Sequence, residues 1–280
     1  MTVLSTADQI EVEEPRHIIT GPIKDAMAVA WRNLRALPRI PQYLVFSTIQ
    51  PVIFVLMFRY VFGGAIKVPG PIPYVDYLIP GVFAQVVVFG SMGTAIGLAT
   101  DMQSGLLERF RSLPMARSAL LAGRTFADTV RNVFVVVLMS LVGFGVGFRF
   151  HGGWLKFIAG CLLVLLFGYA LSWMFATVGL LVGDPKSAQA AGFPILAPLV
   201  FASSAFVPVG TMPKWLQAFA NHQPVSITAS AVRALFLGGN AKYLPNTAST
   251  SSLVLQTIAW CGGIVLVFGP LAVRRYRKAI

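Results

Sequence analysis

The sequence predicts an all-α integral membrane protein with six transmembrane helices, and its composition and charge pattern carry this prediction. Of its 280 residues, 56% are hydrophobic and only 11% are charged, and the mean hydropathy is +0.74. Six apolar stretches bracketed by charges are each long enough to cross the roughly 30 Å hydrocarbon layer of a bilayer. A soluble domain of this length could not bury so much apolar surface, whereas a lipid-facing bundle does not have to.

Charged residues set the limits of the six spans. The first span lies between Arg39 and Arg59, and the others are bracketed in the same way. Pro194 and Pro198 interrupt the fifth span, which favours a bent helix. Together with their connections the spans form one transmembrane domain over residues 22–280, and we place them at about 43–63, 77–100, 126–148, 157–182, 189–208 and 253–273.

The basic residues are distributed unevenly across the predicted membrane. Six crossings put both termini on one side, and that side holds most of the 22 Lys and Arg. Cytoplasmic loops carry the excess of positive charge, so both termini are predicted to lie in the cytoplasm. The opposite side has fewer basic residues, among them Arg149, Lys156 and Arg233. Because the net charge of +12 is spread along membrane-proximal segments, contact with anionic lipid is favoured over nucleic-acid binding.

The N-terminal segment is predicted to have two parts. Residues 1–21 form an acidic tail without an apolar core, which is expected to be mobile and is not a cleavable signal peptide. From Pro22 to about Leu37, apolar residues recur at helical spacing and basic residues lie on the other side. With Trp31 beside the apolar stripe, this is predicted to be an amphipathic helix in the cytoplasmic interface, serving as an anchor and as an elbow into span 1.

Two other segments outside the spans are predicted to be helical. The loop Asp101–Arg124 carries an apolar and a polar stripe, which predict a short cytoplasmic helix stopped by Pro114. Composition alone leaves open whether it lies in the interface or docks into a partner. After span 5, Met212–Ala220 and Ile227–Leu237 predict two short outer helices broken at Pro224. Each is too short to span, so the pair lies on the outer surface or dips back in as re-entrant helices.

No catalytic, cofactor-binding or metal-binding motif is visible in the chain. It contains no GxxxxGK[ST] phosphate-binding loop, no HExxH and no GxSxG sequence. All ten Asp and Glu lie outside the spans or at their ends, and none follows Asp184. Asp128, near Arg124 and Arg131, is predicted to form a helical ion pair. Ion-driven carriers usually keep a carboxylate at membrane depth, so the energy for transport is expected to come from another protein.

Spans 2 and 5 supply the candidate lining of a transport pathway. Their glycines and prolines permit close helix contact and bending. Their apolar and aromatic side chains, with two polar groups among them, suit a route for a hydrophobic compound, although ordinary packing or lipid contact explains any single one more simply. The candidates are Phe83, Gln85, Phe89 and Met92 in span 2, and Phe193, Phe201, Ser204 and Phe206 in span 5.

Two stretches of the chain carry a family resemblance. One is Gly105–Arg131, with Glu108-Arg109 followed by SLPMAR, and the other is Ser203–Gly238, with SSAFVPVGTMPKWLQ and NHQPVS. Together with the six-span plan and the leading amphipathic helix, they make the chain resemble the permease subunit of type-2 ATP-binding-cassette exporters, specifically the daunorubicin/doxorubicin-resistance group. The likeness covers nearly the whole chain from about residue 22.

The resemblance implies partners for this chain. It would pair with a second permease, identical or paralogous, and with two copies of a separate subunit that binds ATP and Mg. The chain would have no ATPase activity of its own. The cytoplasmic loop helix would be the coupling helix, seated in a groove of the ATP-binding subunit. The residues implied in this coupling are Gln103, Gly105, Glu108, Arg109 and Arg111.

The resemblance also implies a transported compound and a location. The exporter would move a hydrophobic or amphipathic compound (a drug, an antibiotic or a lipid) out of the cytoplasm or inner leaflet of a bacterial-type plasma membrane. One alternative is a polysaccharide or glycolipid exporter of the same superfamily. Another is a carrier or channel that works without an ATPase, and the missing carboxylates at membrane depth count against it.

Overall fold

The computed structural model describes residues 26–31, 41–66, 68, 70–106, 117–243 and 249–278 of the chain. Every regular element among these residues is a helix, so the predicted all-α class is confirmed for the part of the chain that the structure describes. The predicted N-terminal tail, residues 1–21, and residues 107–116 of the predicted coupling loop lie outside it.

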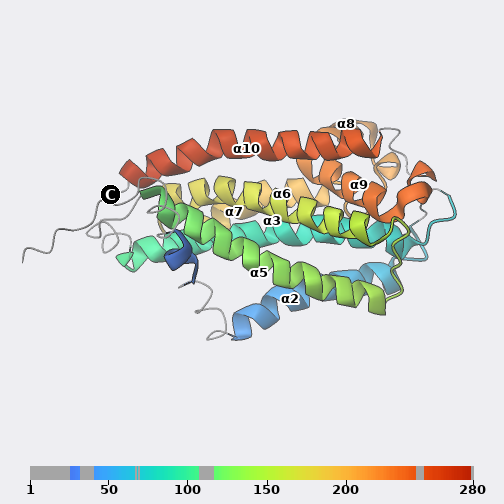
Figure 1. Cartoon of the computed structure of the whole chain (residues 1–280), viewed down its shortest axis with the longest axis horizontal. Helices are drawn as coiled ribbons and strands as arrows, with labels where there is room; N and C mark the ends of the chain where they lie inside the picture. The colour runs from blue at the N-terminus through green and yellow to red at the C-terminus, as the bar shows by residue number, and fades with distance from the viewer. Residues whose placement is uncertain are drawn as a thin grey trace, which may run out of the picture.

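Six helices among the described residues run roughly along the long axis of the molecule and alternate in direction (Figure 1). We call the end where α10 finishes the C-terminal end. The opposite end, which holds α8 (Lys214–His222) and α9 (Pro224–Leu237), we call the α9 end. The six helices are α2 (Pro41–Leu56), α3 (Tyr74–Gln103), α5 (Arg117–Gly145), α6 (Trp154–Val182), α7 (Pro185–Phe201) and α10 (Thr250–Lys278).

Four of these helices are long and apolar enough to cross a membrane: α3, α6, and most of α5 and of α10. The other two are shorter. α2 continues into a π-helical turn, η2 (Met57–Val61), and together they match the predicted first span. α7 ends at Phe201, before the predicted end of the fifth span at 208, and its 17 residues reach about 25 Å at 1.5 Å per residue. Length and composition therefore do not show that the first and fifth predicted spans, α2 and α7, cross the membrane.

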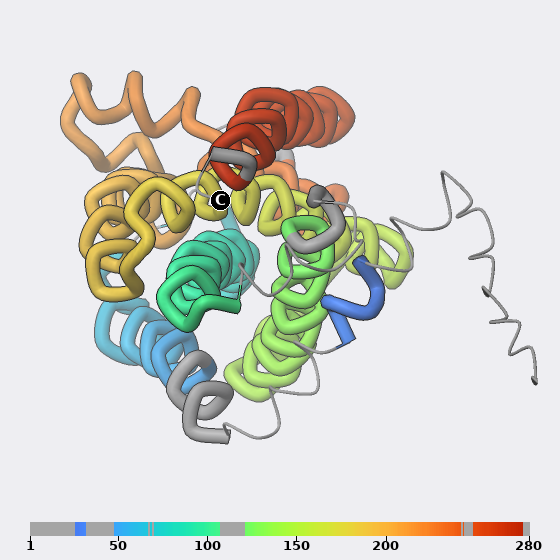
Figure 2. The backbone as a smooth tube through the Cα atoms, turned by 90° about the vertical axis from the view of Figure 1, so that its left-hand side faces the viewer, coloured from blue at the N-terminus to red at the C-terminus, as the bar shows by residue number. Residues whose placement is uncertain are grey.

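α3 is the central helix of the bundle (Figure 2). Every residue from Tyr74 to Val88 is buried, and the helix packs against α5, α6, α7 and α9. α6 packs against both α3 and α10, and Gly179 lets its backbone approach α3, because a Cβ there would lie 2.4 Å from Ala95 O. α10 keeps many apolar side chains exposed, as expected of a helix bordered by lipid.

Residues 26–31 form a helical segment at the C-terminal end. Val29 is buried and packs against α5, where a Cβ on Gly123 would lie 2.8 Å from Val29 Cβ. Trp31 on the same segment is exposed. Val29 belongs to a small buried cluster that includes Tyr276 of α10. The basic residues of the predicted amphipathic helix lie outside the described residues, so its two-sided character and its position in the membrane interface stay predictions.

Two short helices follow α7, as the sequence predicts, with the break between them at Gln223. α8 is exposed over much of its length, and Trp215 is 75% exposed. α9 is instead buried among α3, α6 and α10. Phe236, which a flat arrangement would place at the surface, has no exposed area, and its ring centroid lies 4.8 Å from that of Phe157. α9 therefore fills the space between three other helices.

Candidate functional site at the break after α7

α7 ends in a stretch of non-helical backbone, residues 202–208, at the α9 end of the bundle. Carbonyl oxygens of this stretch accept hydrogen bonds from side chains on distant helices. The Tyr74 hydroxyl donates to Phe206 O at 2.9 Å, and Gln223 Nε2 donates to Ala202 O at 2.6 Å. Irregular backbone at membrane depth needs such partners because lipid supplies none. The chain thus leaves the helical path where side-chain donors meet several of its carbonyl oxygens.

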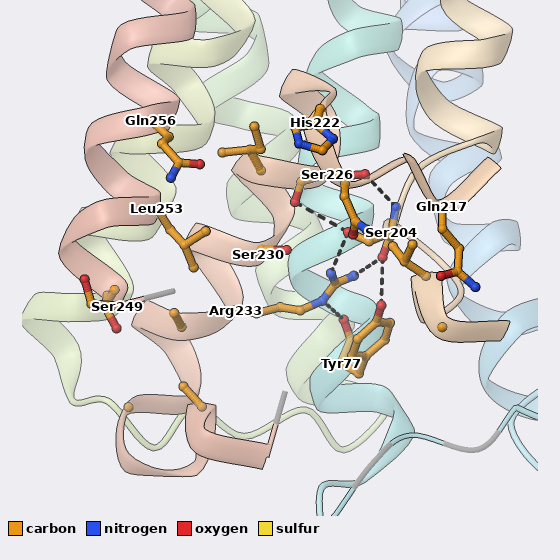
Figure 3. A pocket seen from close by; sticks show the side chains of 18 of the residues that line it. Tyr77, Ser204, Gln217, His222, Ser226, Ser230, Arg233, Ser249, Leu253 and Gln256 are labelled. Atoms are coloured by element: carbon orange, nitrogen blue, oxygen red, sulfur yellow. Dashed lines mark hydrogen bonds between the residues drawn. The ribbon is translucent and has the colours of Figure 1, made fainter. Parts of the chain in front are cut away.

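Arg233 of α9 makes most of the contacts that hold this stretch (Figure 3). Its side chain is buried, with 1% exposed. Nε donates to Tyr77 O at 2.8 Å, and Nη2 donates to Ala205 O at 2.9 Å. Ser204 accepts twice, at its carbonyl oxygen (2.5 Å) and at Oγ (3.1 Å). The guanidinium carbon also lies 3.7 Å from the centre of the Tyr77 ring. One side chain thus joins α9, α3 and residues 204 and 205.

Arg233 is buried without a carboxylate partner among the described residues. Its acceptors are carbonyl oxygens, a hydroxyl and an aromatic ring, and the sequence contains no Asp or Glu after Asp184. The sequence analysis counted Arg233 among the basic residues of the outer side, which stays a prediction; the structure adds that the side chain is turned into the bundle. Oriented dipoles replace the counter-charge that a buried cation usually needs, so the charge of Arg233 has only neutral groups as its direct partners.

Gly81 of α3 makes the close packing of the break possible. A Cβ at this position would lie 1.8 Å from Ala205 O and 2.7 Å from Arg233 Nη2. The first of these neighbours is backbone, which has little freedom to move away. The sequence predicted that glycines in span 2 allow close contact, and at Gly81 this contact is with the irregular stretch after α7.

A cavity of about 990 Å³ opens beside Arg233, between α8, α9 and the beginning of α10 (Figure 3). Its wall is rich in polar groups: α9 contributes Ser226 and Ser230, α8 contributes Gln217, and α10 contributes Gln256. None of the described residues that line it is acidic. Among all the residues that the structure describes, no three His, Cys, Asp or Glu side chains are grouped so that they could hold a metal ion.

The predicted pathway residues of α3 lie inside the protomer. Phe83, Gln85 and Met92 are buried, and Phe89 is partly buried. The Phe83 ring meets the Phe236 ring edge-on, with 5.9 Å between centroids. A pathway along α3 would therefore require the helices around it to separate, and the role of these four residues stays a prediction.

The predicted pathway residues of span 5 divide into two groups. Phe193 and Phe201 of α7 are 52% and 53% exposed, so both face outward from the protomer. Ser204 is held by Arg233 in the break. Phe206 is buried and stacks on Phe58 of η2, with 4.5 Å between centroids and 7° between ring planes. The stack ties the π-helical turn to the break, an interaction that no local sequence pattern indicates.

A second polar cluster, the α3–α5 cluster, joins these helices at the C-terminal end. Arg124 Nη1 lies 2.8 Å from Asp101 Oδ2, across the two helices. Asp128 lies 3.2 Å from Arg131 and 3.9 Å from Arg124, and it accepts a hydrogen bond from the Thr94 hydroxyl at 2.6 Å. The predicted pairing of Asp128 with both arginines is therefore confirmed. Because Asp101 and Arg124 flank the loop between α3 and α5, the cluster also connects the two ends of that loop.

The predicted coupling residues lie in that loop or at its start. Gln103 is the last residue of α3 and is exposed. Gly105 has φ of +67°, a left-handed conformation that favours glycine and lets the chain turn away from the helix. The remaining three lie outside the described residues, and their contacts with a partner stay predictions: Glu108, Arg109 and Arg111.

Comparison with known proteins places the whole arrangement in one family. Residues 25–237 match the model of the ABC-2 type transporter family. The chain is 36% identical over 248 residues to the daunorubicin resistance ABC transporter permease protein DrrB1 of Streptomyces coeruleorubidus, covering 89% of this chain and 84% of the relative. It is 27% identical over 234 residues to the probable doxorubicin resistance ABC transporter permease protein DrrC of Mycobacterium tuberculosis, covering 83% and 81%.

A more distant relative extends the same likeness. The chain is 24% identical over 220 residues to the putative transport permease ycf38 of Cyanophora paradoxa, covering 76% of this chain and 74% of the relative. The family match runs from the N-terminal segment to the end of α9, and it includes the break after α7 and the α3–α5 cluster. This chain belongs to the ABC-2 type transporter family.

Proposed function

We propose that the chain is the membrane-spanning subunit of an ATP-driven exporter for a hydrophobic or amphipathic compound. The observation that carries the proposal is the family match over residues 25–237, together with 36% identity to a permease named for daunorubicin resistance. The sequence has no phosphate-binding loop, so two copies of a separate subunit would bind ATP and Mg and supply the energy. The names of the relatives favour a drug or antibiotic as the exported compound.

In this proposal all six helices cross the membrane. α2 and η2 together cover residues 41–61, which reach about 30 Å. α7 would cross together with residues 202–208, whose carbonyls find side-chain donors as membrane depth requires. The C-terminal end would face the cytoplasm, because the α3–α5 loop and the C-terminal tail are rich in Arg. The α9 end would then face outward.

A second permease, identical or paralogous, would complete the transport route. Phe193 and Phe201 of α7 are about half exposed. α7 lies on the side of the bundle away from α5 (Figure 2). Two such faces meeting across a dimer axis would line an apolar passage, and the candidate residues of α3 would lie behind it. The exposed aromatic side chains of α7 are therefore the first contacts we assign to the exported compound.

Phe201→Ala is expected to change which compounds are exported while leaving the fold intact, because the phenyl ring is about half exposed and little packing is lost. The measurement is export of a panel of hydrophobic compounds at equal expression. Phe126→Ala removes a phenylalanine of similar exposure from α5 and serves as the matched control. A uniform loss for every compound would show that Phe201 acts through packing instead.

Glu108→Ala is expected to uncouple ATP hydrolysis from export. A hydrogen bond to a charged group contributes about 1.5–3 kcal/mol, so export should fall about tenfold or more while ATP turnover continues. The measurement compares both rates in the reconstituted complex. Glu108→Gln keeps the hydrogen-bonding capacity and should retain more export. Unchanged export in Glu108→Ala, at equal expression, would remove this residue from the coupling.

The proposed function itself is tested by co-purification with the ATP-binding subunit in lipid nanodiscs, followed by ATP turnover with and without apolar drugs. A stable complex whose turnover responds to a drug is the expected result. A stable complex that responds instead to glycolipids would favour the glycan-exporter alternative. Failure to form a complex with any ATP-binding subunit would overturn the proposal and favour a carrier or channel.

A further inference from the structure

The cavity at the α9 end has a composition that export through α7 does not explain. We propose that it is a binding site for the anionic headgroup, phosphate or carboxylate, of an amphipathic ligand that reaches it from the outer side. Most of its wall comes from α8, α9 and α10, and Tyr77 of α3 and Ser204 of the break complete one side, whereas the proposed export route follows the exposed aromatic face of α7. The inference goes beyond the proposed function, because binding here requires neither ATP nor a second permease.

The polar wall of the cavity is a stripe along one face of α9. Ser226, Ser230 and Arg233 are spaced four and three residues apart, so they lie on the same side of the helix, and all three line the cavity. Apart from Thr228, the rest of α9 is apolar and mostly buried. A polar stripe on a buried helix of a membrane protein is a functional feature by default, because each polar group there is costly unless it has a partner.

Charge selects the class of ligand. Arg233 brings a formal positive charge to the wall, and its acceptors are neutral groups, so the charge is not cancelled locally. No described lining residue is acidic, and the sequence after Asp184 contains no acidic residue at all. In a partly dry site such a charge acts over several ångströms, and it favours an anion over a neutral or cationic group although Arg233 itself is covered.

Size and the remaining wall indicate an amphiphile rather than a bare ion. The volume of about 990 Å³ is in the range of sites for drug-sized ligands and is far larger than a phosphate ion requires. Ile227 of α9 and Leu253 of α10 line it beside the hydroxyls and amides. A headgroup could therefore lie against Ser230 and Gln256, with the first part of an apolar chain against these two residues.

The test uses the purified full-length chain in nanodiscs and native mass spectrometry as lipid is stripped away. The probes are phosphatidylglycerol, which is anionic, and phosphatidylcholine, which carries no net charge. The wild-type chain should retain phosphatidylglycerol preferentially. Gln256→Glu places a carboxylate in the wall and should reduce this retention about tenfold, through like-charge repulsion. Ser230→Asp does the same from the α9 side, so the test survives if one variant fails to fold.

Ser251→Glu is the matched control, since it adds the same charge at an exposed residue of α10 that does not line the cavity. It should leave retention within about twofold of wild type, because the added carboxylate does not belong to the cavity wall. Equal losses in Ser251→Glu and Gln256→Glu would overturn the proposal, as would equal retention of both lipids by the wild-type chain. Soluble glycerol phosphate, added as a competitor, identifies the source: displacement shows that the headgroup suffices, and persistence shows that the lipid chain is needed.

Discussion

Arg233→Met is expected to lower the free energy of unfolding by on the order of 3 kcal/mol and to abolish export. Methionine fills similar space but donates nothing to Tyr77 O, Ser204 O or Ala205 O. A buried carbonyl that loses its donor costs about 1–3 kcal/mol. Removing the arginine also removes its own desolvation cost, which acts in the opposite direction. We expect the lost hydrogen bonds to dominate, because three acceptors lose a donor in one substitution, although Ser204 O keeps the hydrogen bond from the Tyr77 hydroxyl.

The measurement is thermal unfolding of the detergent-solubilised chain, followed by size-exclusion chromatography. Arg233→Lys should have an intermediate unfolding temperature. Lysine keeps the charge but lacks the planar fork of the guanidinium, so it cannot reach Tyr77 O and Ala205 O at once. Arg274→Met, at an exposed residue near the end of α10, is the control and should change little. A methionine variant more stable than wild type would mean that packing alone holds the break and that the buried cation is kept for binding.

The break after α7 shows why hydropathy located the fifth span only approximately. The apolar run continues to 208, so the sequence predicts a helix that far, yet α7 ends at Phe201. The donors that let the backbone leave the helix come from Tyr74, Gln223 and Arg233. Tyr74 lies on α3 and Arg233 on α9, and neither helix directly adjoins the break along the chain. A window along the sequence cannot register partners more than 100 residues away.

Helices bracketed by charges were predicted more closely. α6 was expected at 157–182 and is found at Trp154–Val182, since an apolar run of this length has few other ways to pair its backbone. α10 was expected to stop at 273, but it continues to Lys278 into the basic tail. A helix does not need lipid to continue, so hydropathy marks where the membrane ends and not where the helix ends.

The candidate site was predicted only in part, for a related reason. Ser204 and Phe206 were selected as pathway residues, and both lie in the break. Arg233, whose side chain holds the break, was counted only among the basic residues of the side opposite the termini. One signal was available: Gln223, Ser226, Ser230 and Arg233 follow one another at helical spacing within an apolar segment. At the C-terminal end, the i,i+3 and i,i+4 spacing within α5 predicted the ion pairs of Asp128. Such spacing cannot predict the ion pair between Arg124 and Asp101, because these residues lie on different helices.

Asp128→Asn is expected to weaken the α3–α5 cluster and to reduce export more than ATP turnover. Asparagine keeps the size of the side chain and can still accept from Thr94, so the substitution removes mainly the charge. Asp128 and Arg131 are each 7% exposed, and removing one partner of a buried pair costs about 3–5 kcal/mol because the other charge remains. The same cluster joins the two ends of the predicted coupling loop, so a loose cluster would pass less of the loop's movement into the bundle.

The control is Asp184→Asn, which removes a partly exposed charge at the N-cap of α7. Hydrogen bonds from Ser187 hold the pKa of the Asp184 carboxyl below its usual value, and asparagine preserves the helix cap, so the melting temperature should change little. Equal effects of the two substitutions on unfolding would show that the cluster adds nothing to the α3–α5 contact.

The double variant Asp128→Asn/Arg131→Gln separates charge from geometry. If the cost of Asp128→Asn arises from an uncompensated Arg131 charge, neutralising both should restore much of the stability, because no buried charge is left alone. Arg131 also donates to Gly90 O at 2.6 Å, and the shorter glutamine loses this bond, so the recovery should be incomplete. We therefore expect the double variant to unfold at a higher temperature than Asp128→Asn alone. If the double variant loses more unfolding free energy than Asp128→Asn and Arg131→Gln lose in total, then hydrogen-bond geometry, and not charge balance, holds α3 to α5.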